Sequence, residues 1–221
     1  MTQHGFARDM DFDCISESAD SLLYSLKSNE DTKAKFPFDF ELQIRHSLDG
    51  NKVTTTWTVI NPSECVLPFQ IGGHPAYMIP TVSEEYDSTG KVVLSGSGKY
   101  KITEIGTKGC VKVGYASFNT NEFEIGRETF KNDAIIFEDP CPQKIELFDR
   151  DGKKVLTFLS SSPALGIWAP YKGVHAPFVC IEPWWGRTDR VEYTGEYKDK
   201  EYINLVEPGK SRAGEWSVIF E

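Results

Sequence analysis

The sequence predicts an all-β protein, most simply a large antiparallel β-sandwich. Short runs of alternating apolar and polar residues end at Gly, Asp, Asn or Pro, which is typical of strands with one buried face. Helical periodicity is nearly absent, and the best helix candidate is the polar stretch 28–35. With 39% hydrophobic residues, the 221-residue chain has enough apolar surface for a sizeable core. Because each apolar sheet face must be covered, we expect two packed sheets in one domain, residues 1–221.

The individual strands are predicted from side-chain parity and turn chemistry. Residues 38–48 and 53–59 alternate on either side of Asp49-Gly50-Asn51, which predicts a hairpin. Residues 145–147 and 155–159 flank Asp151-Gly152 and predict a second hairpin, with glycine supplying a positive φ. Further strands are expected at 134–137, 177–181 and 216–220.

Charge and cysteine content exclude several classes of protein. The net charge is −9 and no Lys/Arg cluster interrupts the acidic balance, so nucleic acid and anionic membranes are not expected partners. The N-terminus lacks the basic and apolar regions of a secretory signal, and no apolar stretch approaches the length of a membrane span. Five scattered cysteines, none in a Cys-x-x-Cys pair, fit a reducing compartment better than a disulfide framework. We therefore expect a cytoplasmic protein.

The first candidate for chemistry is His74, which follows two glycines and precedes Pro75. Glycine permits close backbone approach, and proline restricts the residue before it, so the imidazole would be held rigidly at a pocket wall. On spacing alone, an exposed histidine in a glycine turn is equally consistent with this pattern.

The second candidate is Glu182, which follows the apolar strand 177–181 and enters what we expect to be an aromatic turn at Trp184 and Trp185. Sugars present apolar C–H faces to aromatic rings, while their hydroxyl groups need fixed polar partners. The alternative is that both tryptophans belong to the core and that Glu182 pairs with Arg187.

The remaining polar motifs are weaker on their own. His4 and Arg8 lie at a terminus that is commonly frayed, and Asp133 at the start of a strand is more often a turn residue than a ligand. His46 and His175 look structural, since neither has metal-ligand spacing to a His, Cys or carboxylate. We predict no metal, and the chain lacks a P-loop, a dinucleotide-binding G-x-G-x-x-G motif and a G-x-S-x-G nucleophile elbow.

Taken in order, four motifs resemble the aldose 1-epimerase (galactose mutarotase-like) family, closest to the bacterial branch with an H-G-F-A-R motif: His4-Gly-Phe-Ala-Arg8, Gly-Gly-His74-Pro75, Asn132-Asp133 and Glu182-Pro-Trp-Trp-Gly. The resemblance covers essentially the whole chain and implies a large antiparallel β-sandwich of the galactose mutarotase-like (supersandwich) type. It further implies a mutarotase that interconverts the α and β anomers of an aldohexose without a cofactor.

Carried over residue by residue, the resemblance makes His74 the general acid and Glu182 the general base, with His4, Arg8 and Asp133 positioning the sugar. Opening a hemiacetal removes a proton from the anomeric hydroxyl and delivers one to the ring oxygen, so two groups in different protonation states must face each other. A neighbouring carboxylate, for which Asp133 is a candidate, is expected to raise the pKa of His74 and keep it protonated.

The sequence departs from the family pattern at its start, because members normally have several strands before the H-G-F-A-R motif. The chain therefore looks N-terminally shortened, and an exposed sheet edge or uncovered apolar face is expected to favour a homo-oligomer.

Three other functions stay open at this point. A carbohydrate-binding or regulatory protein would retain the pocket without turnover. A hexose-6-phosphate 1-epimerase would need Arg8, Arg187 and Arg190 to converge on the phosphate. A glycoside hydrolase would use Asp133 with Glu182 as its carboxylate pair and leave His74 unexplained.

Overall fold

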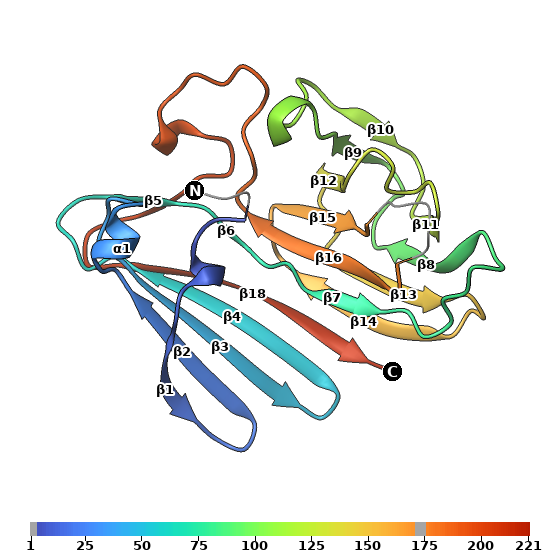
Figure 1. Cartoon of the computed structure of the whole chain (residues 1–221), viewed down its shortest axis with the longest axis horizontal. Helices are drawn as coiled ribbons and strands as arrows, with labels where there is room; N and C mark the ends of the chain where they lie inside the picture. Colours follow the sequence, from blue (N-terminus) through green and yellow to red (C-terminus); the bar gives the residue numbers. More distant parts are fainter. Residues whose placement is uncertain (1–3, 171–175) are drawn as a thin grey trace.

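The computed structural model describes residues 4–170 and 176–221, and its architecture confirms the all-β prediction. Every pairing between named strands is antiparallel, and the strands form a nine-stranded sheet, a seven-stranded sheet and a two-stranded sheet (Figure 1). The described helices are three short 3-10 segments and one α-helical turn: η1 (Ala7–Asp9), α1 (Glu30–Lys33), η2 (Thr107–Gly109) and η3 (Tyr197–Asp199). None of them is long and apolar enough to cross a membrane.

The nine-stranded sheet contains both predicted hairpins. Its spatial order is β1 (Asp13–Glu17), β2 (Ser21–Lys27), β3 (Glu41–Asp49), β4 (Lys52–Ile60), β18 (Ser211–Phe220), β14 (Lys154–Ser160), β13 (Lys144–Asp149), β8 (Ser88–Leu94) and β11 (Glu122–Gly126). Gly50 and Gly152 have φ values of 57° and 80°, so glycine supplies the left-handed conformation at both turns.

The seven-stranded sheet carries the candidate site. Its order is β10 (Ala116–Phe118), β9 (Tyr100–Thr103), β12 (Ile135–Asp139), β15 (Ala164–Trp168), β16 (Phe178–Trp185) and β6 (Ile71–Gly72), and β7 (Ala76–Met78) also pairs with β16. The small third sheet joins β5 (Leu67–Phe69) to β17 (Asn204–Val206).

The main hydrophobic core lies between the two large sheets. Fully buried side chains such as Leu147 and Phe158 from the nine-stranded sheet pack in one cluster with Ile167, Val179 and Ile181 from the other sheet. This is the covered apolar face that the parity pattern predicted. A second cluster surrounds Trp57 and includes Trp185, which contacts the Trp57 ring edge-on at 5.3 Å between ring centroids.

Two predicted elements differ from the structure. The stretch 28–35 forms only one α-helical turn, Glu30–Lys33, which begins at a capping box between Asn29 and Thr32. The aromatic turn expected at Trp184 and Trp185 is wrong, because β16 continues as a strand through both residues. Trp185 is held there by its packing against Trp57.

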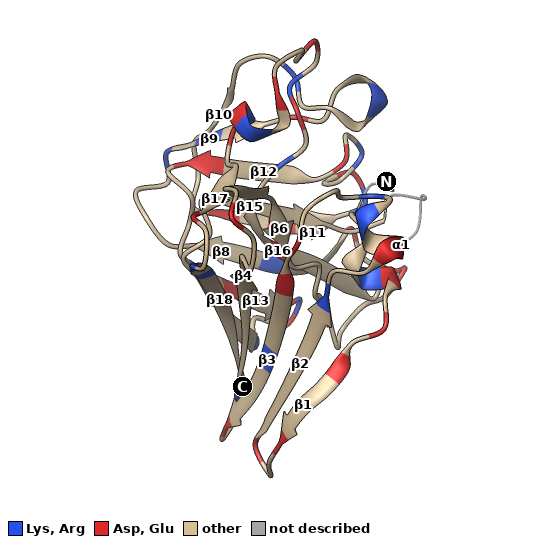
Figure 2. Ribbon diagram, turned by 90° about the vertical axis from the view of Figure 1, so that its left-hand side faces the viewer, with Lys and Arg blue, Asp and Glu red and all other residues tan. Residues whose placement is uncertain are grey.

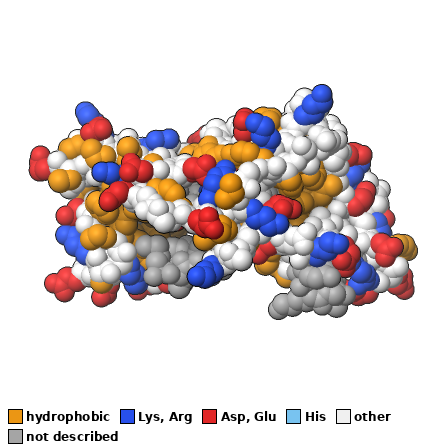
Figure 3. All heavy atoms as spheres, turned by 90° about the horizontal axis from the view of Figure 1, so that it is seen from above, with side chains coloured by type: hydrophobic (Ala, Val, Ile, Leu, Met, Phe, Trp, Pro, Cys, Tyr) orange, Lys and Arg blue, Asp and Glu red, His pale blue; other side chains and the backbone are white. Residues whose placement is uncertain are grey.

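The outer end of the nine-stranded sheet is exposed. Strand β1 forms its edge and is exposed at all five residues, and Ile15 and Leu48 are about half exposed. This agrees with the expected open edge, while self-association stays a prediction. Acidic and basic residues occur along the whole ribbon (Figure 2), and their side chains intermingle on the face shown in Figure 3.

Candidate functional site

Strand register brings His74 and Glu182 together. Gly72 pairs with Trp184 and Ala76 pairs with Cys180, so the segment between β6 and β7 places His74 directly opposite Glu182 on β16. Two backbone hydrogen bonds bracket this position, from the Gly73 amide to the Pro183 carbonyl and from the Ile181 amide to the Pro75 carbonyl. The rigid position predicted for the imidazole therefore comes from a strand pairing that is interrupted at His74.

The glycine before His74 is required by packing. A Cβ added at Gly73 would lie 2.8 Å from the ring of Trp216, closer than real Cβ contacts. The close backbone approach expected of this glycine pair is thus present.

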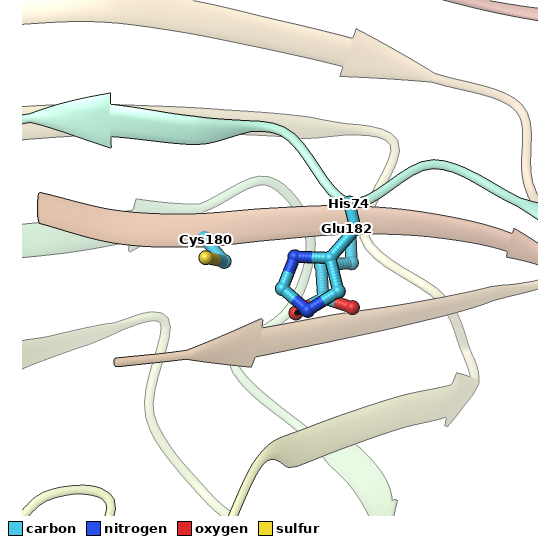
Figure 4. A group of neighbouring side chains, drawn as sticks. All are labelled: His74, Cys180 and Glu182. Carbon is cyan, nitrogen blue, oxygen red and sulfur yellow. Dashed lines mark ion pairs between the residues drawn. The ribbon is translucent and has the colours of Figure 1, made fainter. Parts of the chain in front are cut away.

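Alternation along β16 separates core residues from site residues. Val179 and Ile181 point into the core between the sheets, and Cys180, Glu182 and Trp184 therefore occupy the opposite face. On that face His74 Nε2 lies 3.3 Å from Glu182 Oε1, and the two groups point toward each other (Figure 4). The Glu182 side chain is 7% exposed and that of His74 is 38% exposed, so the imidazole lies on the solvent side of the pair.

Burial dominates the electrostatics of Glu182. Loss of water around the carboxylate raises the pKa of Glu182 from 4.5 to about 8. A hydrogen bond from Trp184 works in the opposite direction, and the charge of Asp133 adds to the rise in pKa. A carboxyl with this pKa exchanges its proton near neutral pH, as a proton-transfer group must.

The expectation for the pKa of His74 is wrong in sign. Burial lowers the pKa of His74, and the nearby charges of His4 and Arg8 lower it further. Asp133 acts on the pKa of Glu182 instead. Burial thus favours the neutral forms of both groups, the carboxylic acid of Glu182 and the neutral imidazole of His74.

The three predicted sugar-positioning residues act on this pair, His4 by a ring contact and Arg8 and Asp133 through their charges. The His4 ring meets the His74 ring edge-on, with 5.1 Å between ring centroids. Arg8 in η1 is exposed, and its Nε lies 3.6 Å from Asp9 Oδ1. Its charge lowers the pKa of His74. Asp133 is exposed with φ 78°, and its side chain accepts a hydrogen bond from the Ala134 amide.

Two further side chains on this face were not singled out from the sequence. Trp168 on β15 contacts His74 edge-on at 6.0 Å between ring centroids, and Cys180 lies two residues before Glu182. One donor atom each from His74, Cys180 and Glu182 lies within 4.8 Å of the others, a donor set that zinc accepts in proteins. The sequence signal for this donor set was the spacing Cys180-x-Glu182, which places both residues on one face of a strand. Action without a metal stays a prediction.

Arg187 does not pair with Glu182, which corrects that alternative. Its buried guanidinium forms ion pairs with Glu138 and Glu201, and Glu201 also pairs with Arg190. Of the three arginines considered for a phosphate, Arg187 and Arg190 are joined through Glu201, while Arg8 lies beside Asp9 and acts on His74. Two histidines were interpreted as structural. The Nδ1 of His46 lies 3.0 Å from the Thr55 hydroxyl oxygen, and His175 lies outside the described residues.

The sequence profile of the aldose 1-epimerase family matches residues 1–203. The chain belongs to the aldose 1-epimerase family. Family membership supports an isomerase that acts on a sugar, of the general epimerase or mutarotase type.

The chain is also similar to several known proteins. The plasmid-encoded protein LacX of Lactococcus lactis subsp. lactis is 26% identical over 212 residues, which cover 93% of this chain and 70% of LacX. The crystal structure of a galactose mutarotase related enzyme from Lactobacillus acidophilus superposes with a TM-score of 0.91 at 29% identity, covering 99% of this chain and 74% of that one. A galactose mutarotase-like protein from Lactobacillus casei ATCC 334 shares the fold with a TM-score of 0.88 at 23% identity, covering 100% and 76% of the two chains.

Proposed function

We propose that this aldose 1-epimerase family member is a mutarotase that interconverts the α and β anomers of an aldohexose, with His74 and Glu182 as the proton-transfer pair. The observation that carries the proposal is the 3.3 Å approach of His74 Nε2 to the buried carboxyl of Glu182, on the face of β16 opposite the core residues Val179 and Ile181. Such a pair suits general acid–base catalysis because burial raises the pKa of the acid and lowers that of the base, which brings the two values toward each other.

The reaction needs one proton in the pair. Transfer of that proton from Glu182 to His74 gives a carboxylate beside an imidazolium. The imidazolium of His74 then protonates the ring oxygen while the carboxylate of Glu182 accepts the proton of the anomeric hydroxyl, and the C1–ring oxygen bond breaks. After rotation about the C1–C2 bond the aldehyde recloses by the reverse transfers, so protons balance and nothing is consumed.

This scheme predicts a bell-shaped pH dependence. Above about pH 8 the pair loses its last proton, because that is the pKa to which burial raises Glu182. At acid pH the pair gains a second proton, with a midpoint below the ordinary histidine value because the pKa of His74 is lowered. We expect maximal kcat/KM between these limits.

Polarimetry on freshly dissolved α-D-glucose and α-D-galactose tests the proposal. Wild-type protein should accelerate the decay of optical rotation, and His74→Gln and Glu182→Gln should each reduce the rate about 100-fold or more. His46→Gln is the matched control, because His46 is on β3 and bonds to Thr55. Unchanged rates in both site variants would refute the assigned roles, and sugar binding without acceleration by the folded wild type would favour a binding protein.

A further inference from the structure

Trp184 lies beside the proposed proton acceptor on the same face of β16. Its indole Nε1–H donates a hydrogen bond to Glu182 Oε2 at 3.3 Å, while the other carboxylate oxygen, Oε1, faces His74 Nε2. The two oxygens of one carboxylate are thus assigned to different partners. A carboxylate held at one oxygen keeps the other directed at its reaction partner.

Two glycines make room for the Trp184 ring. Gly166 on β15 is the cross-strand neighbour of Glu182, and a Cβ built there would lie 2.6 Å from the indole Cζ2 and 2.9 Å from Cη2. Gly72 on β6 pairs with Trp184, and its Cβ would lie 3.0 Å from Cδ1. The ring therefore occupies space that any other residue at Gly166 would fill, and it lies against the sheet next to the carboxylate.

Trp184 is half-buried, in contrast to the buried Trp185 that follows it, so part of the residue stays accessible to solvent. A flat aromatic surface next to a buried acid and an imidazole is suited to bind a pyranose ring. Its C–H face packs on the ring while its hydroxyl groups meet the polar pair.

We propose that Trp184 is a positioning residue that fixes the Glu182 carboxylate through its N–H and receives the apolar face of the sugar ring on its indole. This inference rests on the function proposed above. It adds a ligand contact and a role to a side chain that the acid–base scheme does not use.

The hydrogen bond has a consequence for the shared proton. A donor to the carboxylate stabilises its ionised form, and the Trp184 N–H accordingly lowers the pKa of Glu182 against the effect of burial. Without this donor the proton stays more strongly on Glu182, and the reactive carboxylate–imidazolium form is less populated. A loss of turnover together with a rise in the Glu182 pKa therefore distinguishes this role from simple packing.

Two substitutions separate the two parts of the proposal. Trp184→Phe keeps an aromatic surface and removes the donor, so the alkaline limb of the pH profile should move to higher pH and kcat should fall about tenfold, with KM within about twofold of wild type. Trp184→Leu also removes the aromatic surface and should raise KM about fivefold further. Trp57→Phe is the matched control, since it makes the same change at a tryptophan on β4 in the second core cluster.

A titration that does not depend on turnover completes the test. Carbon-13 NMR of labelled glutamate carboxyls, with Glu182 assigned from Glu182→Gln, should show Glu182 titrating at higher pH in Trp184→Phe and at the wild-type pH in Trp57→Phe. An unmoved Glu182 titration in Trp184→Phe, or equal KM values for Trp184→Phe and Trp184→Leu, would overturn the proposal. A wild-type protein that does not accelerate mutarotation refutes the proposed function instead, and the titration still decides the role of the Trp184 donor.

Discussion

Replacing Glu182 by glutamine should stabilise the folded protein at alkaline pH, even though it removes the proposed proton acceptor. Burial raises the pKa of Glu182 from 4.5 to about 8 in the folded state. Between these values the folded protein holds a proton that the unfolded chain has released. Its contribution to stability is therefore complete below about pH 4.5 and is lost as pH rises toward 8.

The size of this effect follows from the two pKa values. At about 1.4 kcal/mol per pH unit, the difference between 4.5 and about 8 corresponds to on the order of 5 kcal/mol. The side chain is 7% exposed, so little solvent screening reduces it. Glutamine stays neutral at every pH and does not incur this loss.

Equilibrium urea unfolding between about pH 5 and pH 9 measures the prediction. The free energy of unfolding of Glu182→Gln minus that of wild type should be small at pH 5 and increase by about 1.4 kcal/mol per pH unit up to pH 8. Glu64→Gln, at an exposed residue after β4, should keep the pH dependence of wild type. If the Glu182→Gln and wild-type curves run parallel across this range, the carboxyl is not destabilised by burial and the argument fails.

Two further predictions concern the packing around the site. Glu138→Gln should lower the free energy of unfolding by about 3 kcal/mol, because Glu138 and Arg187 form a buried ion pair with side chains 0% and 1% exposed. Glu201→Gln should lower it by less than about 1 kcal/mol, because the Glu201 side chain is 46% exposed. Equal losses would contradict this reasoning. Gly90→Ala should cost several times more stability than Gly152→Ala. A Cβ at Gly90 would lie 2.4 Å from a backbone carbonyl oxygen, whereas Gly152 has open space around it and only a positive φ. Thermal unfolding compares the two variants, and similar midpoints would argue against this reasoning.

The strands were predictable where local signals were complete. Around Gly50 and Gly152, turn chemistry and side-chain parity lie within a few residues of each other, and both hairpins formed as predicted. The end of β16 was not predictable in this way. Trp184 and Trp185 follow a proline and precede a glycine, which locally favours a turn, but packing of Trp185 against Trp57 extends the strand.

The site itself depends on long-range register. Nothing near residue 74 indicates that it lies opposite residue 182, and the resemblance to a family supplied the pairing that strand alternation alone could not. The direction of the His74 pKa also had to come from the structure. It depends on burial and on charges from His4 and Arg8, which are about 70 residues away in sequence.

The arrangement of β16 explains how a sheet can hold a reactive carboxyl without blocking it. An interior strand normally crowds each side chain between two neighbours, but Glu182 has Gly166 on one side and, on the other, a segment whose pairing is interrupted at His74. Pro75 and Pro183 have no backbone N–H to leave unsatisfied at this interruption. The carboxyl is thereby buried enough to hold a proton near neutral pH and open enough on the side of the imidazole to exchange it. Both properties arise from the absence of a side chain at Gly166 and from the strand pairing that is interrupted at His74.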